Sequence, residues 1–136
     1  MLIIGAGSLE EDLRKFINGL ECKNSIIFLG IRKDIPYIMQ GLDVLIIPSF
    51  VEGFPVVAVE AQAAGLPLFV SEDAVTKQVQ LTKGIHFLPL SLGADKWANI
   101  INNTNIQRYD GASKLKEKGF DTRDAAKHII DRFRCL

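Results

Sequence analysis

Two carboxylates, Glu52 and Glu60, stand on either side of Pro55, which begins a long apolar segment. A helix starting at Pro55 would place Glu60 about 7–8 Å along the helix axis, with its side chain tilted back toward the helix N-terminus. Free N–H groups at a helix start favour an anion, and the amides of Gly53 and Phe54 precede them in the chain. Carboxylate oxygens accept hydrogen bonds from vicinal hydroxyls. Together these groups indicate a ligand that carries both phosphate and hydroxyls, such as a nucleotide sugar.

Glu60 also has a purely structural interpretation. The segment Pro55–Ala64 is apolar almost all round, with Gln62 as its other polar side chain, so we expect the helix to be buried on most faces. A buried ionised carboxylate is unfavourable unless it is paired, so the alternative role for Glu60 is an internal hydrogen bond or ion pair. The spacing of the two carboxylates leaves both roles open.

Short apolar runs, separated by helical patterns, organise the rest of the chain. They predict an α/β fold in which a doubly wound parallel sheet carries helices on both faces, in three layers. Ligands of such sheets lie beyond the carboxyl ends of the strands, where loops lead into helices. The expected strands cover residues 2–5, 25–29, 43–48, 67–71 and 85–88. The first expected helix begins at residue 9 and ends near residues 19–22, and the others cover residues 35–41, 55–64, 94–102, 111–118 and 122–133.

The helical segments contain residues with expected local roles. Ser8 and Glu11 have the spacing of a capping box, with Ser8 as the N-cap. Glu10 and Arg14, like Glu11 and Lys15, are four residues apart, which predicts ion pairs on the wet face of the first helix. The side chains expected to pack inward further along the chain are Trp97, Ala126, Ile129, Ile130 and Phe133.

Length and charge restrict the class of protein. The chain has 136 residues, which predicts one domain over residues 1–136. Its 16 Lys+Arg balance 16 Asp+Glu, which argues against a dedicated nucleic-acid binder. No apolar run reaches the roughly 18–20 residues of a membrane-spanning helix. We therefore expect a cytoplasmic protein with at most peripheral contact at the inner face of the membrane.

The cysteines and histidines show no metal or redox pattern. Cys22 and Cys135 lie far apart and lack Cys-x-x-Cys spacing, which fits a reducing compartment and argues against redox chemistry. His86 and His128 each lack a second ligand nearby in the sequence. We therefore expect no metal site.

Two other ligand-binding folds fit the sequence less well. Gly5-Ala6-Gly7 follows a strand, but Glu10 occupies the position of the third glycine in the dinucleotide fingerprint, so a tight strand-to-helix turn is the better interpretation. A signalling receiver domain needs an aspartate at the carboxyl end of a central strand. Asp43 stands at the start of its strand instead.

The segment from Ser49 to Gly65 resembles the donor-binding signature of family 4 retaining glycosyltransferases with the GT-B fold. It combines Glu-x7-Glu, Gly-Phe-Pro after the first glutamate and Glu-Ala-Gln-Ala-Ala-Gly-Leu-Pro at the second. The order of further motifs is similar to the C-terminal, nucleotide-sugar-binding half of that fold. These motifs are Ile3–Gly7, Ile27–Gly30, Asp43-Val44, Pro48-Ser49 and Pro67–Ser71. The more loosely matching segments Asp73–Val79 and Leu88–Leu90 resemble the branch that builds bacterial capsule and exopolysaccharide.

The resemblance implies roles for individual residues. Glu52 would be the catalytic-site carboxylate that binds hydroxyls of the transferred sugar, and the amides of Gly53 and Phe54 would contact sugar and diphosphate. Glu60 would hold the ribose hydroxyls, and the donor-binding segment Gly30-Ile31-Arg32 would pass beside the base. The family needs no bound metal, and we expect no cofactor beyond the nucleoside-diphosphate sugar. The family's Gly-Gly-x-x-Glu pattern is replaced here by residues 74–78, so contacts from that loop are not carried over.

The resemblance also implies partners outside this chain. The complete enzyme would add an N-terminal acceptor domain and transfer a hexose, with retention, to a glycan or lipid-linked acceptor. We expect the 136 residues alone to bind nucleotide sugar weakly and to show no measurable turnover. The alternatives are a nucleotide-sugar epimerase of the same fold and a non-catalytic nucleotide-sugar-binding or scaffolding module. A donor site requires Glu52 and Glu60 to face one cleft at the carboxyl ends of the strands.

Overall fold

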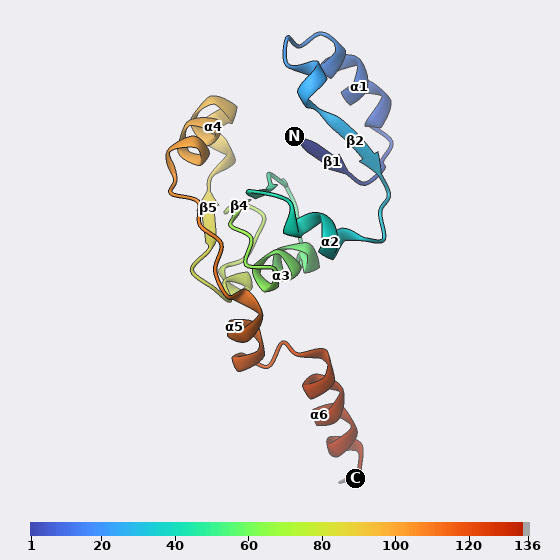
Figure 1. Ribbon diagram of the computed structural model, residues 1–136, viewed down its shortest axis with the longest axis vertical. Coiled ribbons are helices and arrows are strands. Elements are labelled where there is room, and N and C mark those ends of the chain that lie inside the picture. Colours follow the sequence, from blue (N-terminus) through green and yellow to red (C-terminus); the bar gives the residue numbers. More distant parts are fainter. Residues whose placement is uncertain (135–136) are drawn as a thin grey trace. The chain divides into compact units, whose positions relative to one another are not determined.

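The computed structural model describes residues 1–134 (Figure 1). The chain divides into two compact units, Met1–Ile35 and the part that begins at Pro36. Every strand pairing in both units is parallel, which confirms the predicted parallel-sheet α/β fold. The five strands form a two-stranded and a three-stranded sheet, whereas the sequence predicted one sheet. The assignment of residues 1–136 to one domain stays a prediction.

The first unit is a strand–helix–strand element. Strand β1 (Leu2–Ile4) pairs with β2 (Ile27–Gly30), and the register shifts between Ile3 and Ile4. The two strands are joined by helix α1 (Glu10–Asn18) and a 3-10 turn, Lys23–Ser25. The amide of Gly5 donates to the Gly30 carbonyl at 2.8 Å, and both glycines have positive φ, +123° and +62°. Glycine therefore shapes the ends of both strands at their carboxyl edge.

Helix α1 confirms the predicted ion pairs but not the predicted capping box. The Glu10–Arg14 and Glu11–Lys15 pairs have N···O distances of 2.8 and 2.9 Å. Ser8 is not the N-cap, because the helix begins one residue later, with Leu9 at the cap and no side-chain hydrogen bond there. The Glu10 amide bonds to the Gly7 carbonyl at 3.1 Å instead, so a backbone turn replaces the serine hydroxyl.

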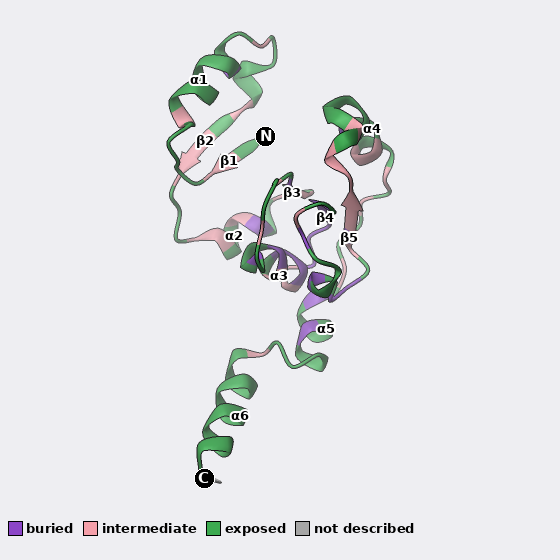
Figure 2. Cartoon of the chain, turned by 180° about the vertical axis from the view of Figure 1, so that it is seen from behind, coloured by how far each residue is buried: buried purple, intermediate pink, exposed green. Residues whose placement is uncertain are grey.

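The second unit is built on three parallel strands in the order β3–β4–β5. All four residues of the central strand β4 are buried, and Figure 2 shows burial concentrated on this strand and on α3. Such an apolar run is typical of a strand covered on both faces. The elements are α2 (Ile35–Gln40), β3 (Leu45–Ile47), α3 (Val56–Ala63), β4 (Leu68–Ser71), β5 (Ile85–Leu88), α4 (Gly93–Asn103), α5 (Gly111–Glu117), α6 (Thr122–Arg134) and the 3-10 turns Lys77–Val79 and Leu90–Leu92.

The packing of the later helices is only partly as predicted. Trp97 of α4 is 6% exposed, and its indole N–H donates to the Pro89 carbonyl at 3.0 Å, so its place in the core is confirmed. The inward packing predicted for α6 is wrong, since no residue of this helix is buried. Its helical periodicity is present, but no part of residues 1–134 covers the apolar face that it creates. That face consists of Ala126, Ile129, Ile130 and Phe133.

Two predicted features need only brief mention. Cys22 is an exposed free cysteine, and Cys135 lies outside the described residues. None of the helices within residues 1–134 is both long and apolar enough to cross a membrane.

Candidate functional site

The candidate site is the connection between β3 and α3, at the carboxyl end of β3. Ile47, the last residue of the strand, is buried, and the chain then runs without regular structure to Pro55. Phe50 and Val51 are 84% and 86% exposed, while Pro55 is buried. Pro55, which the sequence predicted as the first helical residue, is the N-cap of α3, so the helix begins one position later, at Val56. The loop therefore projects from the sheet between two anchored ends.

Glu52 lies within this loop and is half-buried, although its neighbours are exposed. The hydroxyl of Ser49 donates to Glu52 Oε1 at 2.7 Å. No other hydrogen bond or ion pair engages the Glu52 carboxylate within residues 1–134, so Oε2 is left to accept from a ligand. Gly53 and Phe54 follow, both exposed, just before the start of α3. The predicted order of carboxylate, amides and helix start is thus realised along the backbone.

Glu60 is exposed on α3. Its side chain has no hydrogen bond or ion pair to any described residue, so the alternative role as an internally paired carboxylate is wrong. The expected burial of α3 on most faces is also wrong, because Val56 is 64% exposed and Val57 is 37% exposed. The buried face consists of Ala58, Ala61 and Gln62. The Glu60 carboxylate is therefore open to solvent and free to accept hydrogen bonds from hydroxyl groups.

The buried polar residue of α3 is Gln62, whose importance the sequence analysis missed. Its side chain is fully buried. The amide nitrogen donates to the carbonyls of Ala58 (3.0 Å) and Val79 (2.9 Å). The amide oxygen accepts from the N–H groups of Leu81 and Thr82, both at 2.9 Å, and from the Thr82 hydroxyl at 3.1 Å. A neutral amide offers donors and acceptors together, which is why glutamine, and not glutamate, fits the interior here.

The Gln62 network continues to the chain segment before α5. The Thr82 hydroxyl and the Tyr109 hydroxyl are 2.8 Å apart, and burial raises the pKa of Tyr109. The adjacent Arg108 donates to the carbonyls of Met39, Leu42 and Ala64 at 2.5–3.1 Å. The C-terminal end of α3 is therefore fixed by side chains that lie more than 40 residues further along the chain.

Gly30, Ile31 and Arg32 occur in the first unit. Gly30 ends β2 with a φ of +62°, and Ile31 is 81% exposed. Arg32 forms a two-point ion pair with Asp34, with distances of 2.8 and 2.6 Å, and this contact holds the pKa of Asp34 below its usual range. The Arg32 charge is thus already balanced by a neighbour. These residues and the two glutamates lie in separate units, so their joint site stays a prediction, as does a cleft shared by Glu52 and Glu60.

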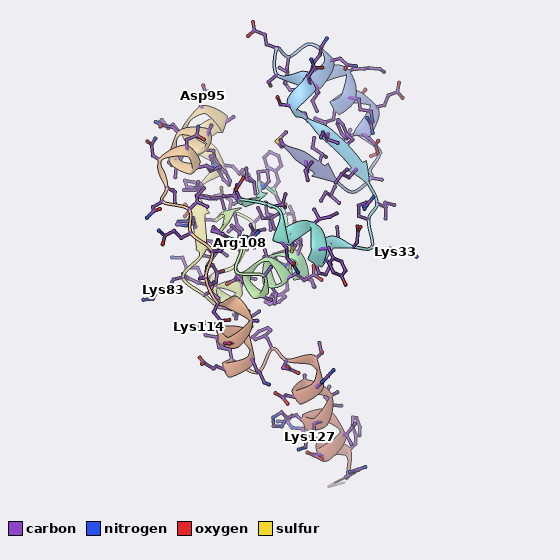
Figure 3. All side chains as sticks on the ribbon, in the orientation of Figure 1. Lys33, Lys83, Asp95, Arg108, Lys114 and Lys127 are labelled. Carbon is purple, nitrogen blue, oxygen red and sulfur yellow. The ribbon has the colours of Figure 1, made fainter. Side chains whose placement is uncertain are left out.

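A groove of about 870 Å³ lies at the opposite, amino edge of the β3–β4–β5 sheet. It is lined by Lys83 and Lys114, both labelled in Figure 3, by Tyr109, and by Pro67 and Gly84, which directly precede β4 and β5. It contains none of the residues predicted to bind the donor. Ligands of parallel sheets bind at the carboxyl edge, so we base the candidate site on the β3–α3 connection and not on this groove. Within residues 1–134, no three His, Cys, Asp or Glu side chains gather as a metal site would require.

Several known proteins are similar to this chain in sequence or in fold. EpsF of Bacillus subtilis (strain 168) is 38% identical over 96 residues, which cover 70% of this chain and 24% of EpsF. UDP-Gal:alpha-D-GlcNAc-diphosphoundecaprenol alpha-1,3-galactosyltransferase of Escherichia coli is 41% identical over 71 residues, covering 52% of this chain and 18% of that enzyme. The crystal structure of Anabaena HepE in complex with UDP superposes with a TM-score of 0.73 at 23% identity, over 99% of this chain and 40% of that one.

The extent of these matches matters for their interpretation. The chain spans about a quarter or less of the length of the two relatives. The match to HepE shows the fold. The family model described as "Glycosyl transferases group 1" matches residues 1–87, which include both strands of the first unit, the β3–α3 connection and β4. The chain therefore belongs to the group 1 glycosyltransferase family.

Proposed function

We propose that this chain is the C-terminal, donor-binding domain of a retaining GT-B glycosyltransferase that uses a nucleoside-diphosphate hexose. The observation that carries the proposal is the β3–α3 connection. There a carboxylate with one free oxygen, two exposed amide-bearing residues and a helix start follow one another, and Glu60 is the exposed polar side chain of the helix, whose other polar residue, Gln62, is buried. The Escherichia coli relative is named for a UDP-galactose donor, and HepE was solved with UDP, which supports a uridine nucleotide as the first donor to test.

Each predicted residue has a role in this proposal. Glu52 Oε2 accepts hydroxyls of the transferred hexose, and the backbone amides of Gly53 and Phe54 contact the sugar and the diphosphate. Glu60 accepts the two ribose hydroxyls. The base lies along Gly30, Ile31 and Arg32, which recognise it through main-chain groups, because the Arg32 side chain is held by Asp34.

Catalysis in the proposed enzyme depends on placement. Holding the donor so that its anomeric carbon is open to the acceptor replaces an encounter in solution with an oriented complex. Charge develops on the diphosphate as the bond to the sugar breaks, and N–H groups directed at its oxygens stabilise that charge in a site shielded from water. The α3 N-terminus and the preceding amides supply such donors. The chemistry requires no metal or other cofactor from this chain.

The remaining partners belong to the complete enzyme. Names of two relatives refer to diphosphoundecaprenol-linked acceptors, and a third is a Vi polysaccharide biosynthesis protein. These names support a glycan or lipid-linked acceptor, bound by an N-terminal domain, in a cytoplasmic enzyme that contacts the inner face of the membrane peripherally. The family match favours a transferase over the epimerase alternative. A non-catalytic nucleotide-sugar-binding module remains the second candidate, because Glu52 and Glu60 would serve binding equally well.

The proposal is tested by titrating the 136-residue chain with UDP and following backbone amide NMR signals, which detect millimolar binding. We expect shifts at residues 53–58 and a loss of affinity of about tenfold in Glu60→Ala, since a hydrogen bond to a charged group is worth about 1.5–3 kcal/mol. Glu117→Ala, an exposed glutamate of α5, is the matched control and should leave the affinity unchanged. Binding that is absent, or equal in both variants, would refute the donor site. In the complete enzyme, Glu52→Ala should chiefly lower kcat, which separates the transferase from the binding module.

A further inference from the structure

The hydrogen bond between Ser49 and Glu52 is the starting point for a further inference, which rests on the proposed function. It links Ser49, the second residue of the β3–α3 connection, to the carboxylate of Glu52, at 2.7 Å between Ser49 Oγ and Glu52 Oε1. Both residues are half-buried. Apart from hydrogen bonds inside helices and strands, this contact is the one hydrogen bond that residues 49–54 make within the described part of the chain. This contact is therefore the main polar restraint on the loop.

Ser49 is well placed to act as a fixed point. It follows Pro48 directly after β3, and that strand is held in the sheet by its parallel pairing with β4, where Ile47 lies opposite Val70. The ring of Pro48 fixes its own φ angle, so the backbone just before Ser49 is restricted. Glu52, in contrast, stands in a loop whose intervening residues, Phe50 and Val51, are almost fully exposed and contribute no packing. The Ser49 hydroxyl thus connects the Glu52 side chain to a backbone segment that the sheet holds in place.

The direction of the hydrogen bond decides its consequence. A serine hydroxyl has one proton, and an ionised carboxylate can only accept, so Ser49 donates. A hydrogen bond to an ionised acceptor is stronger than one between neutral groups. It occupies Oε1 and orients the carboxylate plane, which leaves Oε2 in a defined position. Without the bond, a glutamate side chain keeps the rotational freedom that a ligand would have to restrict on binding.

We propose that Ser49 is a positioning residue: its hydroxyl holds the Glu52 carboxylate in the orientation that accepts a hydroxyl of the transferred hexose. Ser49 touches neither the nucleotide nor the sugar in this arrangement. Its effect is therefore confined to the sugar part of the donor. The affinity for UDP alone, which involves Glu60 and the amides at the start of α3, is independent of Ser49.

The experiment compares the affinities of the 136-residue chain for UDP and for UDP-galactose, by NMR titration of the wild type and variants. Ser49→Ala should weaken UDP-galactose by about fivefold, the smaller part of the value of a charge-assisted hydrogen bond, and leave UDP within about twofold. Ser49→Thr keeps the hydroxyl and should restore the wild-type ratio of the two affinities. Ser91→Ala, at an exposed serine, is the matched control. In a Glu52→Gln background, Ser49→Ala should have no additional effect.

The outcomes separate this inference from the proposed function. If UDP-galactose binds more tightly than UDP but Ser49→Ala changes neither affinity, or if Ser49→Thr does not restore the ratio, the positioning role is refuted and the donor site stands. The same holds if galactose adds no affinity to UDP in the wild type. If neither compound binds the wild type, the proposed function fails and this inference fails with it. An equal loss for both ligands in Ser49→Ala would identify a general structural role instead.

Discussion

The two ends of α3 differ in almost every respect, although the helix has only eight residues. Its N-terminal end is reached through an exposed loop, and the side of the helix that carries Val56, Val57 and Glu60 faces solvent. The opposite side of the helix buries Ala58, Ala61 and Gln62, and its C-terminal end leads to the buried Gly65. One short helix thus presents an open end to solvent and a closed end to the core. The comparison teaches that two polar residues only two positions apart can have different environments: Glu60 faces solvent and Gln62 is buried in the core.

This difference has a simple physical basis. Residues 58, 61, 62 and 65 recur at helical spacing, so they share the face that packs against the rest of the unit. Positions 56, 57 and 60 lie on the remaining arc. Substitutions at the closed end should therefore change the free energy of unfolding, and substitutions at the open end should change ligand binding at nearly constant stability. The predictions below test this separation.

The largest effect is expected for Gln62→Ala. The substitution leaves the Leu81 and Thr82 amides without a partner in a buried place and opens a cavity the size of the lost side chain. We expect a loss of about 4 kcal/mol in the free energy of unfolding, measured by urea titration with the fluorescence of the buried Trp97. Gln78→Ala, at an exposed glutamine, should change it by less than about 0.5 kcal/mol. Comparable losses in the two variants would show that Gln62 does not fix the closed end.

A slightly smaller effect is expected for Gly65→Ala. Gly65 has a φ of +65°, and a Cβ built there would lie 1.9 Å from the backbone carbonyl oxygen of Tyr109, so the backbone would have to move. We expect a loss of about 3 kcal/mol, the upper part of the range for overpacking, in the same urea titration.

Gly119→Ala provides the matched control for this substitution. Its φ is +81°, but no atom lies within 4 Å of the added Cβ, so only the backbone strain remains, about 1 kcal/mol. The difference between the two alanine variants isolates the close approach of α3 and the Tyr109 segment. Equal losses would mean that backbone conformation alone, and not packing, requires glycine at the closed end.

The secondary structure was largely predictable from the sequence. Continuous apolar runs bounded by turn residues predicted the five strands within one or two residues, although β4 alone among them is buried throughout and Ile27 of β2 is 52% exposed. The start of α3 followed from Pro55 to within one position. The cap of α1 was predicted wrongly, since Ser8 has the correct chemistry but the wrong place, and a backbone turn from Gly7 took over its role. Local patterns could not reveal which of two competing turns forms.

The candidate site was less predictable, because burial depends on contacts that are distant in sequence. Glu60 and Gln62 are equivalent as polar interruptions of an apolar helix, and only the Leu81–Thr82 and Tyr109 segments decide which one is enclosed. Two features of the sequence could have identified Gln62 as the buried residue. It lies at helical spacing from Ala58 and Gly65, and burying a neutral amide costs less free energy than burying a carboxylate. Likewise, the apolar periodicity of α6 correctly predicted a helix, but it could not show whether another element covers the apolar face.

The smallest effect is expected for Tyr109→Phe, which keeps the ring and removes the hydroxyl. Thr82 retains its bond to Gln62, so no buried group is orphaned, and the loss should be about 1 kcal/mol at neutral pH. Burial raises the pKa of Tyr109 above its usual 10 in the folded chain. The folded state therefore holds the phenol proton to higher pH than the unfolded state does, and the stability that this residue contributes is complete below about pH 10 and is lost as the pH rises through the folded pKa.

The same variant thus distinguishes a buried, closed end from an open one by its pH dependence. In urea titrations at pH values from about 8 to about 11, the difference in stability between the wild type and Tyr109→Phe should shrink at the alkaline end, because phenylalanine has no proton to lose. Other groups whose protonation changes over this range are common to both proteins and cancel in the difference. Tyr37→Phe, at a tyrosine that is 77% exposed, is the control that should show a constant difference. A constant difference for Tyr109 as well would mean that solvent reaches its hydroxyl, and that the closed end of α3 extends no further than Thr82.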